Sequence, residues 1–232
     1  MVGHSRYLSG PLGKHTRPKV IEFRHLTAIH AQHTILRDVL LEIFEGESVA
    51  ILGAPGAGKS TLLACIQGLV PPAKGEIIVL GATLPPLPPA LQKQMGSMPH
   101  NIAPNTQETV AHCLQRFAEY HMNHLNHEQI RSYIAHYQLS PTTSVNDLTS
   151  LQQRVFALAL ALVHDPSLAL LDEPLAGLTE EEQAQFWPYL QRTKREGRTL
   201  LCTFTPPLAE KHFNGYDLIV SLEQGQIRHV QA

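Results

Sequence analysis

The stretch that most constrains this chain is "GAPGAGKST" at positions 53–61, which directly follows the apolar run "SVAIL". Glycines in such a loop let the backbone wrap closely around an anion and turn its N–H groups inward. The segment "KSTLLACIQGL" behind the loop predicts a helix, and the positive end of that helix favours the same anion. A G-x-x-x-x-G-K-[ST] pattern between strand and helix therefore predicts a phosphate-binding P-loop.

Each part of this loop has an expected role toward a bound nucleotide. Lys59 carries the charge that reaches the β- and γ-phosphates, and Ser60 carries the hydroxyl that ligates magnesium. The expected nucleotide contacts are Gly53, Ala54, Pro55, Gly56, Ala57, Gly58, Lys59, Ser60 and Thr61. A nucleotide with Mg²⁺ is therefore the ligand that this loop predicts.

A second apolar run, "SLALLDEP", ends in two acids and predicts the partner of the P-loop. Asp172 is expected at the carboxyl end of a strand beside the P-loop strand, where it would hold magnesium through water. Glu173 comes one residue later and is expected to accept a proton from an attacking water, as the catalytic residue. The alternative is that the two acids only start a turn or a helix.

Strand-like and helix-like segments alternate along most of the chain, which predicts the fold class. Strands are expected in "VIEFRHLTAI", "VLLEIFEGE", "SVAILG", "GEIIVLG", "SLALLDEP", "TLLCTF" and "DLIVSL". Strands that alternate with helices imply an α/β fold with a mostly parallel sheet covered on both faces. The 232 residues, of which 43% are hydrophobic, suffice for one large domain or for a domain with an inserted subdomain.

Several helices are expected from capping residues and apolar spacing. The region from about residue 105 to 163 reads as helical, with Thr106 and Thr109 as candidate caps and Asn126 with Gln129 as a capping pair. The run "VFALALALV" is too short to span a bilayer and is interpreted as a buried helix. "TEEEQAQFWPYLQRTKREG" is expected to start with a Thr179–Glu182 capping box and to kink at Pro188.

Composition narrows the classes of protein further. The formal net charge of −2 gives no electrostatic argument for a nucleic-acid partner, and the three cysteines form no C-x-x-C pair, which suits a reducing compartment. Residues 1–18 lack periodicity and are expected to form a flexible basic tail, with an anionic lipid or partner surface as the alternative target. The "HMNHLNH" stretch is interpreted as a solvated helical turn, with zinc binding as the alternative.

The motifs together resemble the ATP-binding subunit of ABC transporters, from about Val20 to Val230. The ordered elements are "GAPGAGKST", "LTSLQQ", "LALLDEPLAGL" and "GRTLLCTF", and their order is more specific than any single motif. Segments such as "PPAKGEIIVLG" and "LVHDPSLALLDEPLAGL" look most like the ABC-2 exporter branch. The resemblance implies a P-loop NTPase fold, with a RecA-like core, an antiparallel β subdomain and an inserted helical subdomain at about residues 101–163 of a 19–232 domain.

The resemblance also implies an assembly. In the family two such subunits sandwich two ATP molecules, and each site joins the P-loop and the acid pair of one subunit to the signature of the other. The expected cofactors are ATP and Mg²⁺. The expected partners are a transmembrane permease and a second ATP-binding subunit, and the expected location is peripheral, at the cytoplasmic face of the inner or plasma membrane.

The chain departs from the family pattern at several motifs. The signature reads Leu148-Thr149-Ser150-Leu151-Gln152, so that Leu151 stands where a glycine lets backbone N–H groups approach the γ-phosphate. His100 stands at the position of the glutamine loop, Thr205 at that of the switch histidine and Thr179 at that of an aspartate; His30 maps loosely onto the aromatic that stacks on adenine. The expected nucleotide contacts outside the P-loop are His30, His100, Thr149, Ser150, Leu151, Gln152 and Thr205.

These departures lead to more than one hypothesis of function. The first is an ATPase subunit, impaired in hydrolysis, that powers an exporter as part of an asymmetric heterodimer. The alternative is an ATP clamp that regulates a catalytic partner without hydrolysing ATP itself. A third hypothesis is a soluble ABC protein that acts on DNA or in translation. It is disfavoured because the chain has neither long coiled coils nor tandem ATP domains.

Overall fold

The computed structural model describes residues 17–100, 107–207 and 210–231, and divides the chain into two compact units. One unit comprises residues 1–92 and 205–232, and the other comprises residues 93–204. Residues 1–16 of the predicted tail and Thr106, a predicted cap, lie outside the described residues.

The first unit contains an antiparallel sheet of four strands in the order β2-β1-β4-β5, which are β1 (Lys19–His30), β2 (His33–Phe44), β4 (Lys74–Val79) and β5 (Ala82–Leu84). Alternating burial in β1 and β2 places Ile21, Phe23, Leu41 and Ile43 in the core. The short helix α2 (Pro89–Gln92) follows β5.

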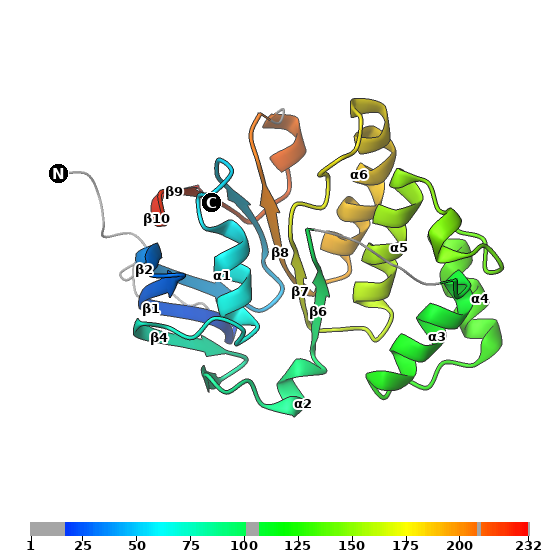
Figure 1. Ribbon diagram of the computed structural model, residues 1–232, viewed down its shortest axis with the longest axis horizontal. Coiled ribbons are helices and arrows are strands. Elements are labelled where there is room, and N and C mark those ends of the chain that lie inside the picture. Colours follow the sequence, from blue (N-terminus) through cyan, green and yellow to red (C-terminus); the bar gives the residue numbers. More distant parts are fainter. Residues whose placement is uncertain (1–16, 101–106, 208–209, 232) are drawn as a thin grey trace. The chain divides into compact units, whose positions relative to one another are not determined.

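The same unit holds the strand that leads into the P-loop. β3 (Ser48–Leu52) pairs in parallel with β9 (Leu218–Glu223), and β9 pairs antiparallel with β10 (Gln226–Gln231). Helix α1 (Lys59–Ile66) follows the loop and packs against β1, β2 and β4 (Figure 1). A short 3₁₀ segment, Glu210–Phe213, precedes β9.

The second unit is built on three parallel strands, β6 (Met95–Met98), β7 (Leu168–Leu171) and β8 (Thr199–Phe204), with β7 between the other two. All of β7 and β8 is buried, as expected for parallel strands that are covered on both faces. β6 is absent from the sequence-based prediction, because "MGSM" contains no β-branched or aromatic residue. Its pairing with β7 makes it a strand.

Helices surround this parallel sheet. They are α3 (Val110–Tyr120), α4 (His127–His136), α5 (Ser150–Leu162) and α6 (Glu180–Arg195), with a 3₁₀ turn at Val145–Asp147. α5 packs against β6 and β7, α6 packs against β8, and α3 contacts both α4 and α5 (Figure 1). The apolar run of residues 155–163 forms most of α5 and its C-cap Val163, and all of it is buried except the half-buried Leu160, so the predicted buried helix is largely confirmed.

The caps confirm several predicted helix starts. Asn126 caps α4 in a capping box with Gln129, and Thr109 accepts a hydrogen bond from the His112 backbone N–H at the start of α3. The expected helical region consists of separate helices, as the separate predicted caps imply. α6 runs through Pro188 without ending there.

Candidate functional site

The P-loop has the predicted position between β3 and α1. Gly58 is the N-cap of α1, with a left-handed φ of 104°, and no side chain caps the helix. The first backbone N–H groups of α1 are thus left for a ligand. Gly53 is also sterically required, because a Cβ there would lie 2.5 Å from the backbone oxygen of Leu222.

Lys59 lies folded back over this loop. Its side chain is buried, and its Nζ donates hydrogen bonds to the carbonyl oxygens of Gly53 at 2.6 Å and Ala54 at 3.1 Å. Nζ also donates to the hydroxyl oxygen of Thr205 at 3.1 Å. Two residues that the sequence assigns to the γ-phosphate therefore contact each other in this unit.

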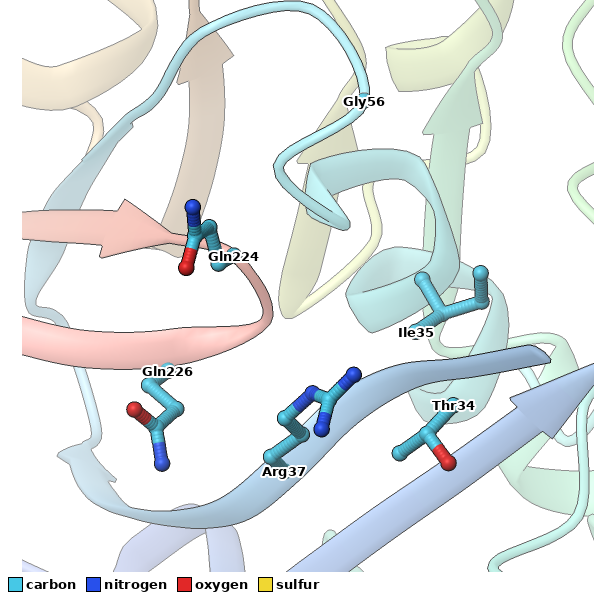
Figure 2. A pocket seen from close by; sticks show the side chains of 6 residues that line it. All are labelled: Thr34, Ile35, Arg37, Gly56, Gln224 and Gln226. Atoms are coloured by element: carbon cyan, nitrogen blue, oxygen red, sulfur yellow. The ribbon is translucent and has the colours of Figure 1, made fainter.

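A cavity of about 490 Å³ borders the P-loop at Gly56. It is lined in addition by Thr34, Ile35, Arg37, Gln224 and Gln226, which come from β2 and from the β9–β10 hairpin (Figure 2). Gly225 joins these segments, since its N–H donates to Ala57 at 3.0 Å and its carbonyl accepts from the N–H of Arg37 at 2.8 Å.

Sequence reasoning missed these lining residues because no motif marks them and they lie far apart in the chain. His30, which the sequence predicts to stack on adenine, ends β1 in an exposed position. It is not among the residues that line this cavity. The side chains that line the cavity beside the P-loop are therefore different from the one that the sequence predicts.

The acid pair follows β7 directly in the other unit. β7 pairs with β6 and β8, so the predicted position of Asp172 after a strand next to the P-loop strand β3 is wrong. Asp172 and Glu173 are both half-buried, and Glu173 has a left-handed φ of 48°. The hydroxyl of Thr203 on β8 donates to Asp172 Oδ1 at 2.7 Å and accepts the backbone N–H of Glu173 at 2.8 Å. The two acids are therefore held by one side chain of the neighbouring strand.

Asp172 and Ser60, the two predicted magnesium ligands, each carry an oxygen of the kind that magnesium prefers. Asp172 presents one oxygen, Oδ2, that takes no hydrogen bond from any described residue, and Ser60 is exposed in the first turn of α1. Mg²⁺ prefers oxygen ligands and is usually bound by one or two carboxylates, substrate phosphates and water rather than by a protein cage. The described residues contain no group of three or more His, Cys, Asp or Glu side chains that could hold a metal. Ser60 and Asp172 belong to different units.

The signature residues form the start of α5. Thr149 is the N-cap, its side chain accepts from the backbone N–H of Gln152 at 3.3 Å, and Gln152 Oε1 accepts from the backbone N–H of Thr149 at 3.0 Å. Ser150 is exposed and Leu151 is half-buried. Thr149 and Gln152 thus form a capping box, which the sequence analysis did not predict.

His100 is tied to α5 through its backbone. Arg154 donates from Nη1 to the carbonyl oxygen of His100 at 3.0 Å, while the His100 side chain is exposed. Burial lowers the pKa of the Arg154 guanidinium, and the negative charge of Glu173 opposes that shift. Arg154 was missed in the sequence because one arginine in a helix carries no motif.

Thr179 has the capping role predicted for it. Its side chain accepts from the backbone N–H of Glu182 at 3.2 Å, and Glu182 accepts from the backbone N–H of Thr179 at 2.9 Å. A threonine in place of the family's aspartate therefore keeps an N-cap at α6.

The expected helical turn in "HMNHLNH" is wrong. α3 ends at Tyr120 and α4 begins at His127, so most of the stretch connects two helices. The ring of His121 stacks on that of His164 with centroids 3.9 Å apart, and His164 Nε2 lies 3.2 Å from the carbonyl oxygen of Met95. Burial lowers the pKa of His164 to about 4. This histidine pair belongs to packing inside the second unit.

None of the described helices combines the length and the apolar character needed to cross a bilayer.

Comparisons with known proteins point to one family. The sequence model of the ABC transporter family matches residues 36–176. The chain is 28% identical over 192 residues to the Nod factor export ATP-binding protein I of Cupriavidus metallidurans, covering 79% of this chain and 62% of that protein. It is 29% identical over 189 residues to the protein of that name from Rhizobium meliloti, covering 79% and 56%. The chain thus spans less than two thirds of the length of these relatives.

Solved structures show the same fold. An ATP-binding subunit of an ABC transporter superposes with a TM-score of 0.78 at 22% identity, covering 92% of this chain and 90% of that one. A dimeric ATP-binding cassette bound to ADP and phosphate also gives a TM-score of 0.78, at 20% identity, covering 91% and 97%. These likenesses confirm the predicted α/β P-loop NTPase fold.

Proposed function

This chain belongs to the ABC transporter family, and from that premise we propose that it binds ATP with magnesium and hydrolyses it slowly to drive or regulate export by a transmembrane partner. The observation that carries the proposal is the P-loop. It joins an uncapped helix N-terminus to a buried lysine whose ammonium lies across the loop. The match to proteins named for Nod factor export supports the export direction.

The chemistry assigned to each residue follows from its position. The backbone N–H groups after Gly58 and the charge of Lys59 hold the phosphates. Asp172 and Ser60 would hold Mg²⁺, which when bound neutralises phosphate charge. Glu173 takes the proton of the attacking water, which makes it the catalytic residue.

The cavity beside Gly56 suits the base and ribose of the nucleotide. Ile35 offers an apolar contact, and Thr34, Arg37, Gln224 and Gln226 offer hydrogen-bonding groups. The lining is mainly polar, so it would recognise a ligand chiefly through hydrogen bonds. The polar groups are proposed to contact the outer part of the nucleotide while the P-loop holds its phosphates.

Slow hydrolysis is proposed from the altered contacts around the γ-phosphate. Thr205 cannot carry the positive charge of a histidine, and its hydroxyl contacts Lys59. Leu151 places a branched side chain at the second helical position of α5, where the family has a glycine. Each positioning or proton-handling group is worth roughly 10²–10⁴-fold in rate, so several changes together matter.

A heterodimer is proposed because the altered motifs then fall unequally on the two sites. In a homodimer every site would combine all the changes. Beside a standard subunit, the site on this chain's own P-loop keeps Lys59, Asp172 and Glu173 and borrows an intact signature. The partner's site receives Leu151. The second candidate function, an ATP clamp that regulates an active partner, rests on this same inequality.

Location and domain layout are part of the proposal. The chain is proposed to lie peripherally at the cytoplasmic face of the inner or plasma membrane, bound to a permease. Residues 19–232 are proposed as one ATP-binding domain with a helical subdomain at about 101–163, and residues 1–18 as a basic tail.

Two substitutions test the proposal. Lys59→Ala removes the charge at the phosphates and is expected to weaken Mg-ATP binding strongly, as measured with a fluorescent ATP analogue. Equal affinity in both proteins would contradict a P-loop function.

Glu173→Gln removes the proton acceptor but keeps the shape of the side chain. In the assembled complex it is therefore expected to lower ATP turnover sharply while ATP still binds. Unchanged turnover of the complex would favour the clamp.

A further inference from the structure

Thr203 lies within the "GRTLLCTF" element and forms hydrogen bonds with both acids of the proposed chemistry, although the sequence analysis predicts no role for it. It is the fifth residue of β8, and its side chain is fully buried. In the sequence, "TLLCTF" is interpreted as a strand and as part of a family element, without a role for the Thr203 hydroxyl. A hydroxyl among apolar neighbours in a buried strand needs a hydrogen-bond partner, and this feature of the sequence could have drawn attention to Thr203.

The direction of the hydrogen bonds around Thr203 follows from their partners. The N–H of Glu173 can only donate, so the Thr203 oxygen accepts it at 2.8 Å. The single hydroxyl proton is then directed to Asp172 Oδ1, 2.7 Å away. The order is Glu173 N–H to Thr203 hydroxyl to Asp172 carboxylate, and such chains polarise and strengthen each other's bonds.

This chain of bonds constrains Glu173 through its backbone. Glu173 has a φ of 48°, a left-handed conformation that non-glycine residues rarely adopt. Such conformations persist where the surroundings over-determine them, and they cluster at functional sites. The bond from its N–H to Thr203 is one of the contacts that hold Glu173 in this conformation.

The same hydroxyl constrains the carboxylate of Asp172. The bond to Oδ1 limits rotation of the carboxylate, and within the described part of the chain Oδ2 takes no hydrogen bond. One oxygen is thus fixed by the protein while the other remains available to a cation or its water shell. Contacts of this kind orient metal-binding carboxylates and tune their affinity.

We propose that Thr203 is a positioning residue for ATP hydrolysis, whose hydroxyl orients Asp172 toward magnesium and fixes the backbone of Glu173 for its role as base. This inference rests on the proposed function. It adds a residue on β8 that acts through the two acids.

The test compares Thr203→Val with Thr203→Ser. Valine has nearly the same shape but neither donates nor accepts, whereas serine keeps the hydroxyl. In Thr203→Val we expect the Mg²⁺ concentration for half-maximal binding of a fluorescent ATP analogue to rise, and kcat to fall, each within about 10–100-fold. Thr203→Ser is expected to restore most of both quantities.

Thr199→Val serves as the matched control for loss of a buried threonine on the same strand. Thr199 is similarly buried at the other end of β8, where its backbone pairs with Leu168 at the start of β7, and the acids follow the opposite end of β7. It is expected to leave the Mg²⁺ dependence unchanged. Unchanged Mg²⁺ dependence and kcat in Thr203→Val would overturn the proposal, as would equal impairment in the serine variant.

The two readouts separate this inference from the proposed function. If the wild-type chain binds Mg-ATP but shows no turnover even in its complex, the ATPase function fails. The Mg²⁺ titration then still decides whether Thr203 positions Asp172. If the wild type binds no ATP, the proposed function fails and the inference falls with it.

Discussion

At the scale of single residues, the contact between Lys59 and Thr205 connects two positions that the family uses for the γ-phosphate. The hydroxyl accepts from the lysine at 3.1 Å, so a phosphate must compete with it for the ammonium group. We therefore expect Thr205→Val to tighten ATP binding, by about 2- to 10-fold for a bond worth roughly 0.5–1.5 kcal/mol. Calorimetric titration with ATP measures this, with Thr205→Ser as the control that keeps the hydroxyl. Weaker binding in Thr205→Val would mean that the hydroxyl stays with Lys59 in the bound state.

The stacked pair of His121 and His164 gives a second prediction at this scale. Burial lowers the folded-state pKa of His164 to about 4, below its ordinary value of 6.5. The unfolded chain therefore binds this proton more readily, and stability is lost as pH falls from about 6.5 toward 4. We expect His164→Phe to reduce the drop in urea midpoint between pH 7 and pH 5. The exposed His124, changed to Asn, is the control, and an identical drop in wild type and His164→Phe would contradict the prediction.

At the scale of elements, the capping boxes show why the helices of the second unit begin where they do. Thr179 and Glu182 satisfy each other's backbone N–H groups at the start of α6. We expect Thr179→Ala to cost about 1 kcal/mol of unfolding free energy, since N-cap threonines are worth 0.5–2 kcal/mol. Urea unfolding measures this, and Gln185→Ala, an exposed change inside α6, is the control. A loss no larger than in the control would show that the box does not stabilise α6.

The altered signature at the start of α5 also forms a capping box. Thr149 and Gln152 bond to each other, so their side chains already have partners within the chain. A helix start that satisfies its own N–H groups has fewer of them to offer a ligand. The capping box and Leu151 thus support the same proposal, that this signature is a weak contact for a partner's ATP.

At the scale of the whole molecule, the proposed inequality of the two ATP sites predicts how the chain assembles. With Mg-ATP alone we expect Glu173→Gln to form few homodimers in light scattering, because each site would contain Leu151 at the interface. Adding Leu151→Gly is expected to increase the homodimer fraction, although a glycine inside α5 costs about 1 kcal/mol of helix stability. A stable ATP-dependent homodimer without the Leu151 change would contradict the heterodimer proposal.

Much of the fold could be predicted because the motifs are local. The P-loop, its flanking β3 and α1, the buried α5 run and the caps of α4 and α6 each depend on residues within a few positions of one another. The short strand β6 could not be predicted, because "MGSM" has no local preference for a strand. The stacking of His121 on His164 could not be predicted either, because the two residues lie more than 40 positions apart in the sequence.

The sequence by itself determined that this chain carries a P-loop, an acid pair after a buried strand and an altered signature, since each is a pattern of adjacent residues. Only the tertiary structure decided which groups meet. Thr203 bonds to Asp172 across 31 positions, Lys59 to Thr205 across 146, and Arg154 to His100 across 54. A polar group in a segment expected to be buried needs a hydrogen-bond partner, and this need can be inferred from the sequence. Which residue becomes the partner depends on strand pairing and packing, because these bring distant residues together.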